Sequence, residues 1–213
     1  MKAERHMFVA GRSALAATRE RTAASRVPDD VLLDAAKKCV LANGMRRTTL
    51  AEIARTAEVS RMTLYRRFPD VRSLLAALMT REFGTLLHNV AAEVTGAAHA
   101  RQRLADSAVA AVRALVADPL MRTVLDLDPE LLLPYITQRL GATQQLAENV
   151  IHALVVAGQQ DGSVRRGETA TQARVVLLVV QSFVMSLRPA TADLDEDSLL
   201  AELRHVLDAA LAP

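Results

Sequence analysis

Apolar residues recur every three or four positions along most of this chain, the spacing that places them on one face of an α-helix. The first clear stretch begins at Val27-Pro28-Asp29-Asp30, where a proline followed by acids is typical of a helix start. It ends at Asn43-Gly44, a pair that commonly stops a helix. Cys39 lies on the apolar stripe between them, and we interpret it as a small core residue rather than a nucleophile.

Two short helices are predicted next. Thr49 and Glu52 have the pattern of a capping box, in which Thr49 caps the helix start and Glu52 reaches back to it. This helix ends at a tight turn, Glu58-Val59, and Ser60 caps a second short helix over residues 61–68. Two short helices separated by three or four residues, the second rich in Arg, Thr and Tyr, have the form of a helix-turn-helix.

The second short helix has one apolar and one polar face. Leu64 and Phe68 share the face that is expected to point into the core. The outward positions are Arg61, Met62, Thr63, Tyr65, Arg66 and Arg67. Arginine pairs with guanine edges, threonine contacts phosphate or a thymine methyl, and tyrosine contacts phosphate, so this face suits double-stranded DNA. The alternative is a small exposed helix that is rich in arginine for solubility.

The rest of the chain is also predicted to be helical. The expected helices span residues 70–95, 101–117, 119–126, 134–160, 169–188 and 196–211. Asp70 caps the first of them, and Thr169 with Gln172 forms another possible capping box. The helix at 169–188 is apolar nearly all round and must be buried on several sides. No strand-like alternation competes, so the predicted fold class is all-α.

Charge is unevenly distributed, although the formal net charge is only +2. Residues 1–82 contain sixteen Lys and Arg against nine Asp and Glu, whereas residues 83–213 contain ten against fifteen. A basic first third suggests that the N-terminal part meets a polyanion, and a merely solvated basic face would give the same count.

Composition argues against several other classes of protein. One cysteine rules out an intramolecular disulfide framework, and the five scattered histidines show no metal-ligand spacing. We therefore expect no cofactor, no metal and no catalytic residues. Residues 1–27 have no sustained apolar stripe and are predicted to form a flexible basic arm that includes Arg12, Arg19, Arg21 and Arg26. The longest apolar run, residues 175–187, is too short to cross a bilayer, so a cytoplasmic protein is expected.

Two segments carry a specific resemblance: GMRRTTLAEIA at residues 44–54 and VSRMTLYRRFP at residues 59–69. Together they resemble the DNA-binding region of TetR-type (TetR/AcrR-like) transcriptional regulators, and the resemblance covers about residues 29–78. It implies an N-terminal three-helix helix-turn-helix domain over residues 28–75, preceded by the arm. Residues 76–213 would form a C-terminal helical domain for ligand binding and dimerisation.

The resemblance also implies a homodimer that binds operator DNA and releases it when a small apolar molecule enters the C-terminal domain. The implied DNA contacts are Thr49, Ser60, Arg61, Met62, Thr63, Tyr65, Arg66, Arg67 and Arg72. Candidate pocket residues, chosen because they interrupt otherwise apolar helices, are His88, Asn89, Tyr135, Gln138, Gln181 and Phe183. The last two helices would pair with their copies in the dimer, with Leu203 and Leu207 at the interface.

Three positions depart from the family pattern. Glu58 stands where a turn glycine is usual, and a positive φ there would cost about 1 kcal/mol. Val71 stands where a lysine usually meets phosphate, with Arg72 next to it, and Met62 stands where a glycine is frequent.

Two other functions stay open. One is a helical ligand carrier or enzyme whose basic face is incidental, although an enzyme would need converging acids, bases or a nucleophile that the sequence does not group. The other is a nonspecific architectural DNA binder, which predicts salt-sensitive binding with little sequence preference.

Overall fold

The computed structural model describes residues 27–213, and this part of the chain forms helices without any strand. The N-terminal helices are α2 (Asp29–Asn43), α3 (Leu50–Thr56) and α4 (Arg61–Arg67). The others are α5 (Val71–Glu93), α6 (Ala100–Ala117), α7 (Pro119–Leu127), the 3-10 turn η1 (Pro129–Leu132), α8 (Leu133–Thr137), α9 (Ala142–Gln160), α10 (Thr169–Ala190) and α11 (Glu196–Leu211). The predicted all-α class is confirmed, whereas the predicted arm, apart from Val27, lies outside the described residues.

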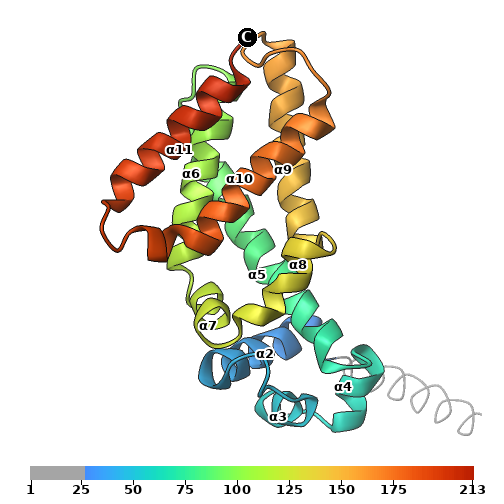
Figure 1. Cartoon of the computed structure of the whole chain (residues 1–213). Helices are drawn as coiled ribbons and strands as arrows, with labels where there is room; N and C mark the ends of the chain where they lie inside the picture. Colours follow the sequence, from blue (N-terminus) through green and yellow to red (C-terminus); the bar gives the residue numbers. More distant parts are fainter. Residues whose placement is uncertain (1–26) are drawn as a thin grey trace, which may run out of the picture.

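The helices form two groups that α5 joins (Figure 1). Helices α2, α3 and α4 cluster at one end of the molecule, and α6, α9, α10 and α11 make up the other end. Helix α6 is central to the second group because it packs against α5, α9, α10 and α11. Helix α5 also packs against α2, so one continuous helix belongs to both groups and crosses the predicted domain boundary at residues 75–76.

Only one of the two hydrogen bonds of the predicted capping box forms at the start of α3. The Thr49 hydroxyl accepts the N–H of Glu52 at 3.2 Å. The carboxylate of Glu52 instead accepts a hydrogen bond from the side-chain amide of Asn43 at 2.7 Å. The second half of the predicted capping box is therefore replaced by a contact with the end of α2, against which α3 packs.

The starts of α4 and α5 follow the predicted caps. The Ser60 hydroxyl accepts the N–H of Thr63 at 3.1 Å, and the Asp70 carboxylate accepts the N–H of Ser73 at 2.7 Å. Each bond satisfies an N–H that a helix start leaves without a partner. Helix α4 is thus placed between two sharp corners that the sequence specifies locally.

The core of the N-terminal group is small and well closed. Ile53, Ala54 and Leu64 are at most 1% exposed, and Phe68 is also buried. Cys39 is buried on the same side of α2, with its sulfur 3.4 Å from the Thr56 hydroxyl, which agrees with its interpretation as a core residue. The two apolar residues predicted to anchor α4 do so.

The single helix predicted over residues 134–160 is wrong. Helix α8 ends at Thr137, the backbone leaves helical geometry at Gln138 (φ −125°), and α9 begins only after Gly141. The Gln144 side chain stabilises this break by accepting the N–H of Gly141 at 2.7 Å and donating to the Tyr135 carbonyl at 2.9 Å. A side chain at residue 141 would also meet the Tyr135 ring at 2.9 Å, so glycine is needed for the close approach.

The capping box predicted at Thr169 and Gln172 is also wrong. Glu168 caps α10, since its carboxylate accepts the N–H groups of Ala170 and Thr171. Gln172 is buried and donates to the Arg165 carbonyl at 3.2 Å. A carboxylate at the positive end of the helix dipole replaces the hydroxyl cap, because a charged acceptor forms the stronger bond there.

Helix α10 is longer than its apolar run suggested. At 22 residues, with a mean hydropathy of 1.5 in its most apolar window, it has the length and composition of a membrane-crossing helix. The length argument from residues 175–187 therefore does not exclude a span. In the described chain, α10 packs against α9 and α6, and 33% of that window is buried. Core packing accounts for part of its apolar character.

Candidate nucleic-acid interface and apolar cavity

Helix α4 turns most of the predicted DNA-contacting side chains outward. Met62 is 77% exposed and Tyr65 is 52% exposed, and the side chains of Arg61 and Arg66 are exposed beside them. Leu64, on the opposite face, is completely buried. The result is a short helix with a closed apolar back and a cationic front, the arrangement needed for a helix that enters the major groove.

Three predicted contacts are hydroxyl groups at helix starts. Thr49 and Ser60 are exposed, and Thr63 is half-buried with its hydroxyl 2.9 Å from that of Ser60. A hydroxyl that accepts a backbone N–H keeps its own hydrogen and can still donate it to a phosphate oxygen. The caps of α3 and α4 therefore serve the fold without excluding a phosphate contact.

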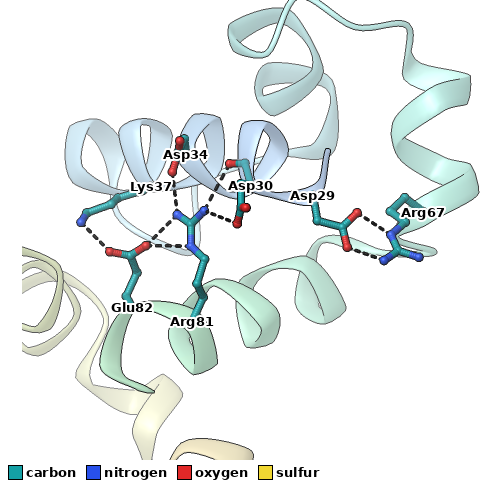
Figure 2. Close-up of polar contacts among 7 residues, drawn as sticks. All are labelled: Asp29, Asp30, Asp34, Lys37, Arg67, Arg81 and Glu82. Carbon is teal, nitrogen blue, oxygen red and sulfur yellow. Dashed lines mark hydrogen bonds and ion pairs between the residues drawn. The ribbon is translucent and has the colours of Figure 1, made fainter. Parts of the chain in front are cut away.

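Arg67 lies away from the others, because its guanidinium pairs with a carboxylate of α2. Figure 2 shows both nitrogens of this fork on Asp29, with Nε donating to Oδ1 at 2.6 Å and Nη2 pairing with Oδ2. The Asp29 carboxylate also raises the pKa of Arg67 above its ordinary value. In this structure Arg67 ties the end of α4 to the start of α2, so it helps to position α4.

The turn between α3 and α4 contains a strained residue. Glu58 has φ +55°, and among non-glycine residues of the described chain it alone has a positive φ. The conformation follows from the turn itself, in which the N–H of Val59 reaches back to the Ala54 carbonyl at 2.9 Å. A residue with a Cβ is unfavourable there, which is why a glycine is expected at this position.

Replacing Glu58 with glycine should therefore stabilise the protein. We expect Glu58→Gly to raise the free energy of unfolding by about 1 kcal/mol, as measured by urea denaturation. The matched control is Ala57→Gly, one residue earlier at φ −84°, which should lower stability because glycine gains nothing there. Equal shifts for the two variants would contradict the strain argument.

A second ion-pair cluster fixes α2 to α5. Arg81 of α5 reaches Asp34 at 2.7 Å and Asp30 at 3.3 Å on α2, and it also pairs with its neighbour Glu82 at 2.6 Å (Figure 2). Lys37 of α2 pairs with the other oxygen of Glu82 at 2.5 Å. We call these five residues the Arg81 hub. It joins the N-terminal group to α5 as one unit.

A large cavity lies along α5 and extends into the C-terminal group. Its volume is about 840 Å³, and its walls come from α5, α6, α7, η1, α8, α9 and α10, with one end at the loop between α2 and α3. Most lining side chains are apolar, such as Phe83, Leu104 and Leu154. A space of this size and character is typical of a site for a small, mainly apolar molecule.

The predicted pocket residues divide into two sets. Tyr135, Gln138 and Gln181 line the cavity. The predictions of His88 and Asn89 are wrong, because neither residue lines the cavity, and both are exposed on α5. Phe183 is also wrong, since it packs against the core beside the cavity without lining it. A helix shows one face to the cavity, and a polar interruption does not reveal which face that is.

Sequence reasoning missed other polar groups of the lining. Gln144 sits between Tyr135 and Gln181, donating to the Tyr135 carbonyl at 2.9 Å and to the Gln181 side chain at 2.5 Å. The guanidinium of Arg139 lies 5.4 Å from the Tyr135 ring centre, a cation–π contact. Arg72, predicted as a DNA contact, is exposed and lines the cavity. Gln144 was detectable only as the third residue of a helix whose start was not predicted.

The last two helices carry exposed apolar side chains. Val175 and Leu178 of α10 are 55% and 51% exposed, and Val206 of α11 is 46% exposed. Leu203 and Leu207, the residues expected at a dimer interface, are only 1% and 2% exposed and belong to the core of the protomer. Their placement at an interface is therefore wrong, because their side of α11 packs against α6.

Comparisons with known proteins agree on a family. Residues 32–78 match the model of bacterial regulatory proteins of the tetR family. An HTH-type transcriptional regulator of Mycobacterium bovis is 39% identical over 177 residues, which cover 83% of this chain and 90% of that protein. A regulator of Mycobacterium tuberculosis shows the same identity and coverage.

Solved structures show the same fold at low sequence identity. The transcriptional regulator FadR from Bacillus subtilis, in complex with stearoyl-CoA, is 18% identical with a TM-score of 0.62, covering 85% of this chain and 98% of that chain. The TetR family repressor AlkX from Dietzia sp. is 20% identical with a TM-score of 0.60, covering 86% of this chain and 95% of that chain. At these identities the similarity concerns the fold alone.

Proposed function

We propose that this chain, which belongs to the tetR family of bacterial regulatory proteins, is a ligand-responsive repressor. It binds operator DNA as a homodimer and releases the DNA when a small apolar molecule occupies the cavity along α5. In this proposal residues 28–75 bind DNA, and residues 76–213 bind the effector and form the dimer. A repressor of this kind acts in the cytoplasm, where the DNA is.

The observation that carries the proposal is the front of α4. Arg61, Tyr65 and Arg66 point outward from a helix whose opposite face is anchored by buried Leu64. Asp29 holds Arg67 at the other end, which fixes the direction of α4 relative to α2. Rigid presentation of several hydrogen-bond donors is what direct reading of base edges requires.

The cavity supports a mainly apolar effector. Polar side chains are a minority of its lining, two of them, Gln144 and Gln181, are joined by a hydrogen bond, and most of the wall along α5 and α6 is apolar. The FadR structure, which has a similar fold, contains stearoyl-CoA, so a long acyl chain is a reasonable first probe for this cavity. An enzyme or carrier that does not bind DNA remains the competing proposal, and among described residues no cluster of metal ligands favours it.

A gel shift with the DNA upstream of the gene tests the DNA half of the proposal. At fixed salt, the dimer should bind this fragment about a thousand-fold more tightly than random DNA of equal length. Arg61→Ala should weaken specific binding by about 1–3 kcal/mol per base contact and leave binding to random DNA nearly unchanged. Equal affinity for both fragments would identify an architectural binder, and no binding would favour a carrier or an enzyme.

Adding stearoyl-CoA to the protein–DNA complex tests the effector half. The expected result is release of DNA while light scattering still reports a dimer. Linkage requires that operator DNA weaken stearoyl-CoA binding by the same factor. If stearoyl-CoA binds free and DNA-bound protein equally well, it is not the effector of this chain.

A further inference from the structure

A buried carboxylate connects the N-terminal helices to the wall of the cavity. Asp128 follows α7 and is only 4% exposed. Its Oδ2 accepts the backbone N–H of Met45 at 2.6 Å and that of Arg46 at 3.4 Å, in the loop between α2 and α3. These partners are more than eighty residues away in the sequence. We call this contact the Asp128 clasp.

The loop is pressed closely against the carboxylate. Gly44 has φ +81°, and a Cβ at this residue would lie 2.8 Å from Asp128 Oδ2 and 3.3 Å from the Leu127 side chain. Glycine is therefore required both by the backbone conformation and by the approach. Next to the clasp, Arg46 forms an exposed ion pair with Glu130 of η1. The contact is directional and leaves little room for the loop to shift.

Both sides of the clasp form part of the cavity wall. Met45 and Arg46 line the cavity from the loop, and Glu130 and Leu131 line it from η1. A molecule that fills this end of the cavity touches the two surfaces that Asp128 joins. Any movement of η1 that accommodates such a molecule is transmitted to the loop through the carboxylate.

Two polar contacts attach the N-terminal group to the rest of the protein, in addition to the packing of α2 against α5 and α7. The Arg81 hub fixes α2 to α5, and the Asp128 clasp fixes the loop after α2 to the corner between α7 and η1. With one of these polar contacts alone, rotation of the group about α5 would be opposed mainly by the packing of α2 against α5 and α7. Two attachments at different helices define its angle, so a shift between α5 and η1 must reorient α4.

We propose that Asp128 is the positioning residue that sets the angle of the DNA-binding domain and transmits cavity occupancy to it. For its DNA readout this inference rests on the proposed function, whereas the domain angle is independent of it. Removal of the Asp128 carboxylate would leave the Met45 N–H without this partner. The loop after α2 would then separate from the corner between α7 and η1.

The experiment measures the domain angle and operator affinity in full-length protein. Dyes at Arg55→Cys and Gln160→Cys, in a Cys39→Ser background, report the distance between the two groups by single-molecule energy transfer. Both sites are exposed, and an excess of unlabelled protein restricts the signal to one chain. The variants are Asp128→Ala and Asp128→Asn, whose amide oxygen can still accept the Met45 N–H.

The matched control is Asp161→Ala, at the far end of the molecule. Asp161 also accepts two backbone N–H groups, from Ala100 at 2.9 Å and Ser163 at 2.8 Å, but it joins no part of the N-terminal group. Melting temperatures of the variants show how much each loss affects folding. A purely structural role for Asp128 would lower the melting temperature and leave the domain distance unchanged.

We expect Asp128→Ala to broaden the distance distribution and to weaken operator binding at least about tenfold, the effect of losing one charge-assisted bond. Asp128→Asn should keep most of the wild-type distance distribution and most of the operator affinity. Asp161→Ala should change neither quantity. A wild-type distance distribution in folded Asp128→Ala overturns the inference. If wild-type protein binds no operator, the proposed function fails, yet the distance measurement still decides the role of Asp128.

Discussion

Three glutamates on the exposed face of α10 and α11 should convert the protein to a monomer. The combined variant Val175→Glu, Leu178→Glu and Val206→Glu replaces side chains that are about half exposed in the single chain (55%, 51% and 46%). Burial in a dimer would stabilise each of these apolar side chains by about 1–2 kcal/mol. Each side chain contributes twice, because a symmetric homodimer contains two copies of it. Unpaired carboxylates at the same places are costly to desolvate and repel their copies.

Loss of the dimer should also abolish tight operator binding. Two linked half-site domains bind about a hundred-fold or more tightly than one, because the second contact is intramolecular. Light scattering at micromolar concentration and a gel shift measure the two effects. The control is Leu41→Glu, which makes the same apolar-to-glutamate change at a 39% exposed residue of α2 and should leave the dimer intact. A triple variant that remains dimeric would place the interface elsewhere.

The buried leucines of α11 show why the exposed face of this helix could not be identified from the sequence alone. The stripe of α11 is broad enough to serve a core or a dimer, and the sequence does not tell which residues face inward. Packing of α11 against α6 assigns Leu203 and Leu207 to the core and leaves Val206 outside. Leu203→Glu is therefore expected to unfold the protein rather than to dissociate it.

The helix-turn-helix was predictable because its determinants are local. Thr49, Ser60 and Asp70 cap helices within three residues of their own positions, and the strained turn at Glu58 follows from a short connection. These bonds depend on sequence neighbours alone. Their prediction needed no knowledge of tertiary packing, and the structure confirms them.

The residues that connect the two groups were not predictable in the same way. Asp29 is 38 residues from Arg67, and Asp128 is 83 residues from Met45, so nothing in a local pattern joins them. Arg67 looked like one more outward arginine on α4 until its partner was placed. The break before α9 likewise depends on Gln144 reaching Tyr135, a contact that exists only after the chain has turned.

The Arg81 hub should make a large contribution to stability that depends on pH. Arg81 is 22% exposed and Glu82 is 18% exposed, whereas Asp30 and Asp34 are 80% and 64% exposed. Exposed pairs contribute little, so the half-buried Arg81–Glu82 contact dominates. We expect Arg81→Met, which keeps the apolar stem, to lower the free energy of unfolding by about 2 kcal/mol at neutral pH.

The pH dependence identifies the partner. Burial alone would raise the pKa of Glu82, but hydrogen bonds from Lys37 and Arg81 outweigh it and lower the pKa below its ordinary value. A lowered carboxyl pKa stabilises the folded state fully above the pKa of an unfolded glutamate, about 4.3, and this stabilisation is lost as the pH falls through the folded value. The difference between wild type and Arg81→Met should therefore be largest near neutral pH and shrink below about pH 4.

Urea denaturation at several pH values measures this difference. The matched control is Arg113→Met, which removes an arginine paired with Asp197, where the side chains are 49% and 76% exposed. Its effect should stay within about 0.5 kcal/mol at every pH, because solvent screens such a pair. An Arg81→Met deficit that does not change with pH would mean that the methionine disturbs packing between α2 and α5, and that the Arg81–Glu82 ion pair contributes little to stability.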